Sequence, residues 1–291
     1  MTAVSSFPKT LESFSKEIET VLEALLPPPT TRLHQAMRYS VLGGGKRLRS
    51  FFAWAGSQLY DVPPAQALKT AAVLEIIHSY SLVHDDLPCM DNADFRRGKP
   101  SCHTAFGDAT ATLVGDALIP LAFQTLSSLG VTSEIRLELI EGLAHTIGSL
   151  GLVAGQMRDL GQEDWPRTFE GLLELQYLKT GILFGFAAEA GAILGNASTL
   201  ERQGLKSYGI LFGQSFQMMD DWLDGHGQED IIGKPCGMDA DKFTFLSLLG
   251  PDLLHEKIEW TIAEAIRELA PFGERAAYLR EAALSVLEQG K

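Results

Sequence analysis

Residues 71–91 read AAVLEIIHSYSLVHDDLPCMD, a long apolar run that ends among three aspartates. Apolar residues fill most of the first fourteen positions, which predicts a buried helix of about four turns. The carboxylates of Asp85, Asp86 and Asp91 follow at its C-terminal end. Because buried carboxylates are costly unless cations meet them, this helix end is a candidate cation site.

The chain is expected to bend directly after Asp85. Pro88 disfavours helical backbone at Leu87. A straight helix would hold Asp85 and Asp91 about 9 Å apart by rise alone, whereas a bend brings Asp91 round towards Asp85. His78 lies two turns before Asp85 on the same face. Such a histidine is more often a satisfied core residue, but beside an acidic metal site it is a candidate diphosphate contact.

A second acidic motif, GQSFQMMDDWLD, occupies residues 213–224. Gln217, Asp220, Asp221 and Asp224 are spaced three or four apart, so they share one helix face. A solvated acidic face is the alternative, but large apolar residues surround these acids in the sequence. Two such clusters facing each other would form a cage for Mg²⁺, a cation that prefers oxygen ligands, and through it for a diphosphate.

Basic residues stand where an anion needs them. GGGKRLR at 43–49 is a glycine turn followed by three cations, which suits phosphate but is not a P-loop. RRGK at 96–99 follows the first acids and could also serve only to neutralise them. Lys179 interrupts an apolar helix, and Lys234 follows the second acidic motif. Together these acids and cations indicate a site for one or two diphosphates.

Composition excludes several other classes of function. The net charge of −13 and pI near 5.0 disfavour nucleic-acid binding. The cysteines Cys89, Cys102 and Cys236 lack zinc-ligand spacing and indicate reduced thiols in a cytoplasmic protein. No secretory signal is evident, and the most apolar stretch, Gly181 to Gly195, is too short for a bilayer. We expect that stretch to be a core helix and the protein to have no stable membrane anchor.

Apolar residues recur at helical spacing along nearly the whole chain. One such stripe runs from Leu11 to Leu25 and is ended by prolines 27–29. Alternating β-branched runs are absent from the sequence, so we expect an all-α fold with ten or more helices. No linker, charge block or repeat divides the 291 residues, so residues 1–291 are expected to form one domain.

The motifs, taken in order, resemble those of a known family. The chain resembles the trans-isoprenyl diphosphate synthases, most closely the bacterial-type farnesyl diphosphate synthases, from about Tyr39 to Gly250. That resemblance implies one polyprenyl synthetase domain, an orthogonal helical bundle of the isoprenoid synthase type with a central cavity, and a homodimer. It is carried by YSVLGGGKRLR (39–49), LEIIHSYSLVHDDLPCMDNADFRRGKPSCH (74–103), GQMRDL (155–160), LKTGILF (178–184), GQSFQMMDDWLD (213–224) and GK (233–234).

The resemblance also implies roles for individual residues. Three Mg²⁺ ions are implied, and their ligands are Asp85 and Asp91, supported by Asp86, and Asp220, with Asp224 acting through water. The allylic diphosphate is implied to bind Arg96, Lys179 and Lys234. Isopentenyl diphosphate is implied to bind Lys46, Arg49, His78 and Arg97. Thr180 and Gln217 are similar to residues that line the reacting allyl group. The implied catalytic set is Asp85, Asp91, Lys179, Thr180, Gln217 and Asp220.

The implied reaction is a Mg²⁺-dependent, head-to-tail prenyl transfer that makes farnesyl diphosphate. Tyr80 lies about 7.5 Å deeper along the helix than Asp85, where its ring would act as a floor for the growing chain, unless it is simply a core aromatic. Ser81 beside it is too small to do so. The resemblance implies that an aromatic at the position of Tyr80 goes with a C15 product. The alternatives are a geranyl or geranylgeranyl diphosphate synthase and a non-catalytic synthase subunit. A terpene cyclase is disfavoured because it would not need Lys46, Arg49 and His78.

Two segments depart from the family pattern. Asn92 and Ala93 stand where close relatives usually carry further acids. We expect these two changes to adjust the activity of the first acid cluster and not to abolish it. Gly237 to Gly250 is divergent and shorter, and Lys242 within it is a candidate ligand.

Overall fold

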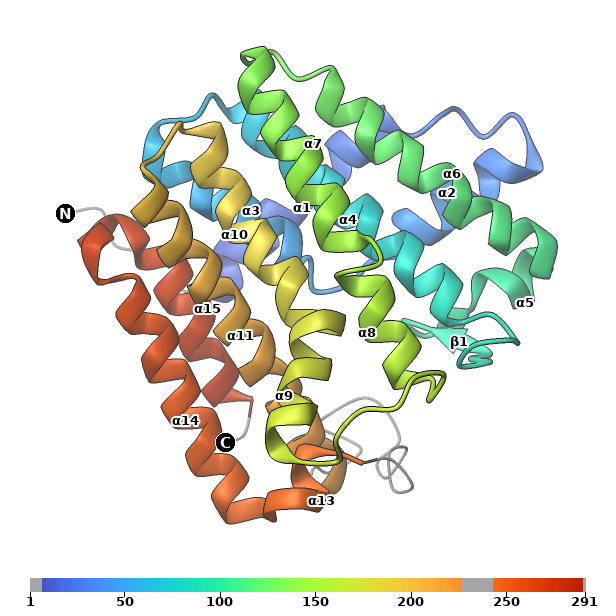
Figure 1. Ribbon diagram of the computed structural model, residues 1–291. Helices are drawn as coiled ribbons and strands as arrows, with labels where there is room; N and C mark the ends of the chain where they lie inside the picture. Colours follow the sequence, from blue (N-terminus) through green and yellow to red (C-terminus); the bar gives the residue numbers. More distant parts are fainter. Residues whose placement is uncertain (1–6, 227–242, 290–291) are drawn as a thin grey trace.

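The structure is a computed structural model that describes residues 7–226 and 243–289 (Figure 1). Three predicted residues, Lys234, Cys236 and Lys242, lie outside the described residues. The long helices are α1 (Phe7–Leu25), α2 (Arg32–Val41), α3 (Leu48–Ser57), α4 (Pro64–Asp85), α6 (Asp108–Ser127), α7 (Ser133–Ile147), α8 (Leu152–Asp159), α9 (Phe169–Gln176), α10 (Ile182–Leu194), α11 (Thr199–His226), α14 (Pro251–Glu268) and α15 (Ala277–Glu288). The short elements are η1 (Gln58–Tyr60), α5 (Cys102–Phe106), η2 (Tyr177–Gly181), α13 (Phe245–Leu249) and η3 (Ala270–Ala276).

The predicted all-α class is confirmed. Figure 1 shows helices crossing at varied angles, with α14 and α15 on one side of the molecule and α6 and α7 on another. The helix α4 ends at Asp85, as the sequence predicts, and α1 ends at Leu25, before the run of prolines. Helix boundaries are therefore set locally, by the end of the apolar pattern and by proline.

Helix α10 lies at the centre of the bundle. Its sequence, ILFGFAAEAGAIL, is apolar nearly all round, and twelve of its thirteen residues are buried. A helix of this kind must be covered on every side. It packs against α3, α4, α7 and α11. The approach to α3 is so close that a Cβ on Gly191 would lie 2.3 Å from the backbone nitrogen of Ser57.

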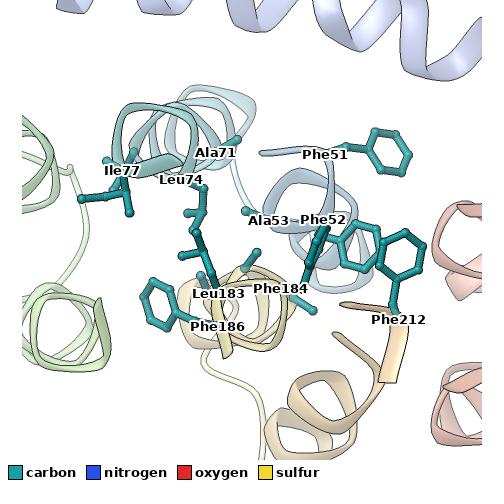
Figure 2. Packing of buried hydrophobic residues seen from close by; sticks show 14 of the residues in the cluster. Phe51, Phe52, Ala53, Ala71, Leu74, Ile77, Leu183, Phe184, Phe186 and Phe212 are labelled. Atoms are coloured by element: carbon teal, nitrogen blue, oxygen red, sulfur yellow. The ribbon is translucent and has the colours of Figure 1, made fainter. Parts of the chain in front are cut away.

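The core joins α3, α4, α10 and α11 into one cluster. Figure 2 shows Leu74 of α4 directed towards Leu183 and Phe184 of α10. The Phe52 and Phe212 ring centroids, from α3 and α11, lie 4.5 Å apart. Rings packed this closely fix the angles between helices, because interiors tolerate few voids.

A small hairpin departs from the all-helical expectation. The strands β1 (Phe95–Arg96) and β2 (Lys99–Pro100) pair antiparallel directly after the first acid cluster. Arg97 and Gly98 connect them, with φ of 54° and 72°. Positive φ at both central residues is the backbone of the tight hairpin turns, which match the twist of paired strands. Strands of two residues are too short for a period-2 pattern to reveal them.

Three described helical stretches are long and apolar enough to cross a membrane by length and composition alone: 108–127, 133–159 and 169–194. The third contains α10, and 83% of its apolar window is buried inside the molecule. The prediction of a core helix from Gly181 to Gly195 is therefore confirmed. The first two windows are only 39% and 28% buried, so α6, α7 and α8 carry apolar side chains on the surface.

Candidate active site

The first acid cluster lies at the C-terminal end of α4. The Asp91 backbone nitrogen donates to the Asp85 carbonyl oxygen at 2.9 Å, so the chain bends as the sequence predicts. Burial raises the pKa of the half-buried Asp85 carboxyl to about 6, and the nearby Asp91 carboxylate raises it further while Lys179 opposes both. A raised pKa means that the surroundings disfavour the negatively charged form of the carboxyl group. A bound cation would favour that form and lower the pKa again.

Asp86 does not join the other two acids. Its side chain is 3% exposed and forms an ion pair with Arg96 at 2.5 Å. The structure pairs these two groups, which the resemblance assigns to metal support and to the allylic diphosphate respectively. The pair links α4 to β1 and fixes the hairpin against the acid cluster. Asn92 lies beside it with φ of 50°, a conformation that asparagine tolerates well.

The second acid cluster lies on α11. The Gln217 side chain donates to Asp221 Oδ1 at 3.1 Å, and the Phe245 backbone nitrogen donates to Asp221 Oδ2 at 3.0 Å. Asp221 thereby anchors the start of α13. The carboxylate of Asp220 acts electrostatically on Arg49, and Asp224 is half-buried one turn further along α11.

Lys179 connects the two acid clusters. It lies with the buried Thr180 on η2, a π-helical turn of the kind often found at functional sites. Its ammonium forms an ion pair with Asp159 of α8. Lys179 also lines a cavity of about 380 Å³ with Gln217 and Asp221.

Two glycines, one on α8 and one on α11, let these helices pack closely against η2. A Cβ on Gly155 would lie 2.6 Å from the Lys179 backbone nitrogen, and one on Gly213 would lie 2.9 Å from the Gly181 Cα. These glycines open the motifs GQMRDL and GQSFQ. Asp159, the partner of Lys179, was not assigned a role from the sequence, and its place in GQMRDL was the signal available for finding it.

A cationic cavity of about 340 Å³ lies beside α3 and the hairpin. It is lined by Lys46, Arg49, His78, Arg96 and Arg97, among others. The Arg49 guanidinium lies 4.5 Å over the Phe184 ring, and its Nη1 lies 3.3 Å from His78 Nε2. Lys46 Nζ lies 5.2 Å from the Phe216 ring centroid and donates to Gln289. All four residues that the resemblance assigns to isopentenyl diphosphate therefore lie in one cavity.

Electrostatics distinguishes His78 from the other residues of this cavity. Burial, together with the arginines around it, Arg49 first, holds the pKa of His78 well below its ordinary value. His78 is therefore a neutral hydrogen-bonding group at pH 7. Burial also lowers the pKa of Arg49 to about 10, which leaves it charged at pH 7, and its Nε is buried without a hydrogen-bond partner among the described residues.

A small chamber of about 100 Å³ lies where the two regions meet. Arg49 and His78 line it from the cationic cavity, and Asp85, Lys179 and Thr180 line it from the acid side. The structure therefore brings groups from three separate parts of the chain, α3, α4 and η2, to one space. Two substrates anchored on opposite charges would meet there.

Tyr80 and Ser81 lie at a larger cavity of about 560 Å³ between α4 and α8. Ser81 lines both this cavity and the small chamber, so the two spaces share a wall. Tyr80 is 6% exposed, and its ring packs edge-on against His84 at 5.9 Å. Burial raises the pKa of the Tyr80 hydroxyl to about 12, so the ring is neutral.

Among the described residues, no three Asp, Glu, His or Cys side chains converge closely enough to form a metal site by themselves. The donors nevertheless fit Mg²⁺, which is commonly bound through one or two carboxylates together with waters and substrate phosphates. The raised pKa of Asp85 is the observation that favours such a cation. Asp91, at the turn after α4, is exposed to solvent.

The sequence matches the family model for polyprenyl synthetase over residues 30–271. The chain belongs to the polyprenyl synthetase family. A farnesyl diphosphate synthase of Geobacillus stearothermophilus is 39% identical, over 89% of this chain and 91% of that protein. A chloroplastic geranylgeranyl pyrophosphate synthase of Catharanthus roseus is 40% identical, over 92% of this chain and 76% of that protein.

Solved structures agree with the family assignment. The apo structure of an FPP/GFPP synthase from Zymomonas mobilis is 42% identical, covers 95% of this chain and 97% of its own, and superimposes with a TM-score of 0.85. The predicted resemblance to the isoprenyl diphosphate synthases is thereby confirmed. The chain is a prenyltransferase, a short-chain prenyl diphosphate synthase of the farnesyl or geranylgeranyl type, and polyprenyl synthetases generally depend on Mg²⁺.

Proposed function

We propose that this polyprenyl synthetase condenses isopentenyl diphosphate with dimethylallyl and geranyl diphosphates to give farnesyl diphosphate. The observation that carries the proposal is the small chamber, which is lined both by cationic-cavity residues and by acid-side residues. Arg49 and His78, with Lys46 and Arg97 beyond them, would hold isopentenyl diphosphate. Lys179 and the two acid clusters would hold the allylic diphosphate, with Lys234 a further candidate outside the described residues.

The acids would hold up to three Mg²⁺ ions together with the allylic diphosphate. Asp85 and Asp91 would ligate on one side, and Asp220, with Asp224 through water, on the other. When bound, Mg²⁺ would neutralise the diphosphate leaving group and so ease ionisation of the allylic C–O bond. The resemblance to the family gives Asp86 a supporting role, which here would act through its ion pair with Arg96.

The residues of the chain would orient the reactants and exclude water. Lys179 donates to the departing diphosphate, and Thr180 and Gln217 lie beside the allyl group. Arg49 and His78 hold the second diphosphate so that its alkene faces the allylic carbon. The new C–C bond forms, diphosphate leaves with the allylic electron pair, and a proton lost from the condensed product goes to the released diphosphate. Leu82, Leu152 and Leu183 also line the chamber and would protect the cationic intermediate from water.

The position of Tyr80 is the reason for proposing a C15 product. A prenyl tail anchored at the acid clusters would extend into the 560 Å³ cavity, which Tyr80 lines from α4. Geranylgeranyl or geranyl diphosphate synthesis is the alternative within the class. A non-catalytic subunit of a prenyl diphosphate synthase is a further alternative.

Product analysis tests the proposal. Purified protein is incubated with Mg²⁺, isopentenyl diphosphate and each allylic primer, and the products are dephosphorylated and separated by chromatography. We expect farnesol from dimethylallyl and geranyl primers. Geranylgeraniol as the main product would contradict the chain length, and no condensation with either primer would contradict the activity.

We propose that the protein is a cytoplasmic homodimer without a stable membrane anchor. The support for the dimer is a set of exposed apolar side chains on α6, α7, α8 and the turn that joins α7 to α8. A contiguous apolar patch usually marks an interface. These side chains are Leu113, Leu137, Leu150, Val153 and Met157. Lysine at both Leu113 and Leu137 is expected to give a monomer in sedimentation analysis. Wild-type protein that sediments as a monomer would contradict the homodimer, and wild-type protein that partitions into vesicles would contradict the absence of a membrane anchor.

A further inference from the structure

One buried carboxylate, Glu75 of α4, belongs to neither acid cluster. Its side chain is 1% exposed, and its Oε1 accepts from Arg47 Nη1 at 2.5 Å. Ser50 of α3 donates to the other carboxylate oxygen at 3.3 Å. Arg97 of the hairpin turn approaches from a third direction, with Nη2 3.6 Å from Oε1. Glu75 therefore connects α4 to the 42–47 turn, to α3 and to the hairpin.

Both arginines that reach Glu75 have strained backbones. Arg47 has φ of 51° and Arg97 has φ of 54°, in the left-handed region. That conformation is unfavourable for a residue with a Cβ, and it persists only where the surroundings enforce it. Arg47 also donates to the Val41 carbonyl oxygen at 3.1 Å, and Arg97 donates to the carbonyl oxygen of Gly44. The side-chain contacts thus compensate for the backbone strain.

The glycine turn is shaped around Arg97. Gly45 has φ of 117°, and a Cβ placed on it would lie 2.5 Å from Arg97 Cζ. The turn and the hairpin are therefore in direct contact, although 52 positions separate Gly45 from Arg97. Glu75 lies beneath this contact.

The position of Glu75 determines where the cavity's cations lie. Arg47 and Glu75 form part of the cavity wall, and Arg47 is only 4% exposed. Its neighbour Lys46 and Arg49, in the first turn of α3, line the same cavity. Holding Arg47 in place therefore also fixes the direction in which the side chains of Lys46 and Arg49 enter the cavity. A carboxylate at this place subtracts from the positive charge, so attracting an anion cannot be its role. Orientation is the role that remains.

We propose that Glu75 is a positioning residue for the diphosphate of isopentenyl diphosphate. Its carboxylate holds the turn and the hairpin together through Arg47 and Arg97, so that Lys46, Arg49 and Arg97 converge on one anion. This inference rests on the proposed assignment of the cationic cavity to isopentenyl diphosphate.

The test is steady-state kinetics of Glu75→Gln with each substrate varied in turn. The variant keeps the shape and removes the charge. We expect the KM for isopentenyl diphosphate to rise about ten- to hundredfold, as for loss of charge-assisted hydrogen bonds, with kcat and the allylic KM within about twofold of wild type. Glu75→Asp keeps the charge but shortens the reach, so we expect a smaller rise.

The matched control is Glu189→Gln on α10, which removes the partner of Lys206 in an ion pair away from the cavity. We expect both KM values to stay at the wild-type level there. Should Glu75→Gln not fold, as judged by circular dichroism, Glu75→Asp carries the test. An unchanged or lower KM for isopentenyl diphosphate would overturn the proposal, as would an equal rise of both KM values with a lower Tm. These outcomes can be distinguished from a failure of the proposed function itself. In that case the wild-type protein would not consume isopentenyl diphosphate at all.

Discussion

The cationic cavity and the acid clusters meet at one chamber, but their charges are balanced in different ways. In the cavity, Arg47 and Arg97 already meet Glu75, and Arg49 lies over the Phe184 ring. At the acid clusters, burial raises the pKa of Asp85 to about 6, and Asp91 adds to the shift. In the first region protein groups fix the orientation of the cations, whereas in the second burial and a neighbouring carboxylate disfavour the ionised form of Asp85.

This difference indicates how each region would bind a diphosphate. The cavity offers arginine and lysine groups with their orientation fixed, so it can bind the anion directly. The acid clusters would repel the same anion unless divalent cations came with it. One substrate is therefore expected to bind to protein groups and the other through Mg²⁺.

The largest effect is expected from removing the acids. Asp85→Ala or Asp220→Ala should each lower kcat by on the order of 10³-fold, because stabilisation of the leaving diphosphate is lost. Asp94→Ala, an exposed acid just before the hairpin, is the control and should stay near wild type. Near-wild-type turnover by both Asp85→Ala and Asp220→Ala, with folding intact, would remove the metal role of the clusters.

The next effect separates the two substrates. Arg49→Ala should raise mainly the KM for isopentenyl diphosphate, and Lys179→Ala mainly the KM for the allylic substrate, each by about ten- to hundredfold as a charged contact is lost. Kinetics with each substrate varied in turn provides the measurement. The reverse pattern would show that the two sites are exchanged.

A change of product tests the wall between α4 and α8. Tyr80→Ala should extend the cavity and shift the product from C15 to C20 or longer, with condensation retained. Tyr80→Phe keeps the ring and should keep the C15 product, which makes it the matched control. Chromatography of the dephosphorylated alcohols distinguishes the two. If an active Tyr80→Ala protein still makes only C15, the floor of the cavity lies elsewhere.

The smallest effect concerns pH. The pKa of His78 is lowered well below its ordinary value by burial and the surrounding arginines. The unfolded chain takes up a proton at this residue below about pH 6.5, whereas the folded chain does not until lower pH, so folded stability is lost as pH falls below 6.5. His78→Gln should therefore lose less Tm than wild type between pH 7.5 and 5.5. Equal losses in thermal melts would contradict a neutral His78.

Local features of the fold were predictable from the sequence. The bend after Asp85 follows from Pro88, and the burial of α10 follows from its apolar composition. These features depend on neighbours within a few positions, which periodicity and proline geometry describe well.

Pairings between distant segments were not predictable. The partners Asp86 and Arg96 are ten positions apart across a hairpin too short to show a pattern, and Lys179 meets Asp159 only because α8 packs on η2. The sequence marks all four residues as charged, but it does not say which of them neutralise one another. Glu75 lies inside the apolar run of α4, and the sequence likewise does not show that it meets Arg47 and Arg97.

The most direct test of the account is the Mg²⁺ dependence of binding for each diphosphate, measured by calorimetry on wild-type protein. Isopentenyl diphosphate is titrated with Mg²⁺ and with EDTA, and so is an allylic thiolodiphosphate that does not ionise. The account predicts that the Kd for isopentenyl diphosphate changes by less than about threefold, while allylic affinity falls at least about a hundredfold without Mg²⁺. Equal loss of both affinities in EDTA, or retention of both, would contradict the division of the site into a protein-built half and a metal-dependent half.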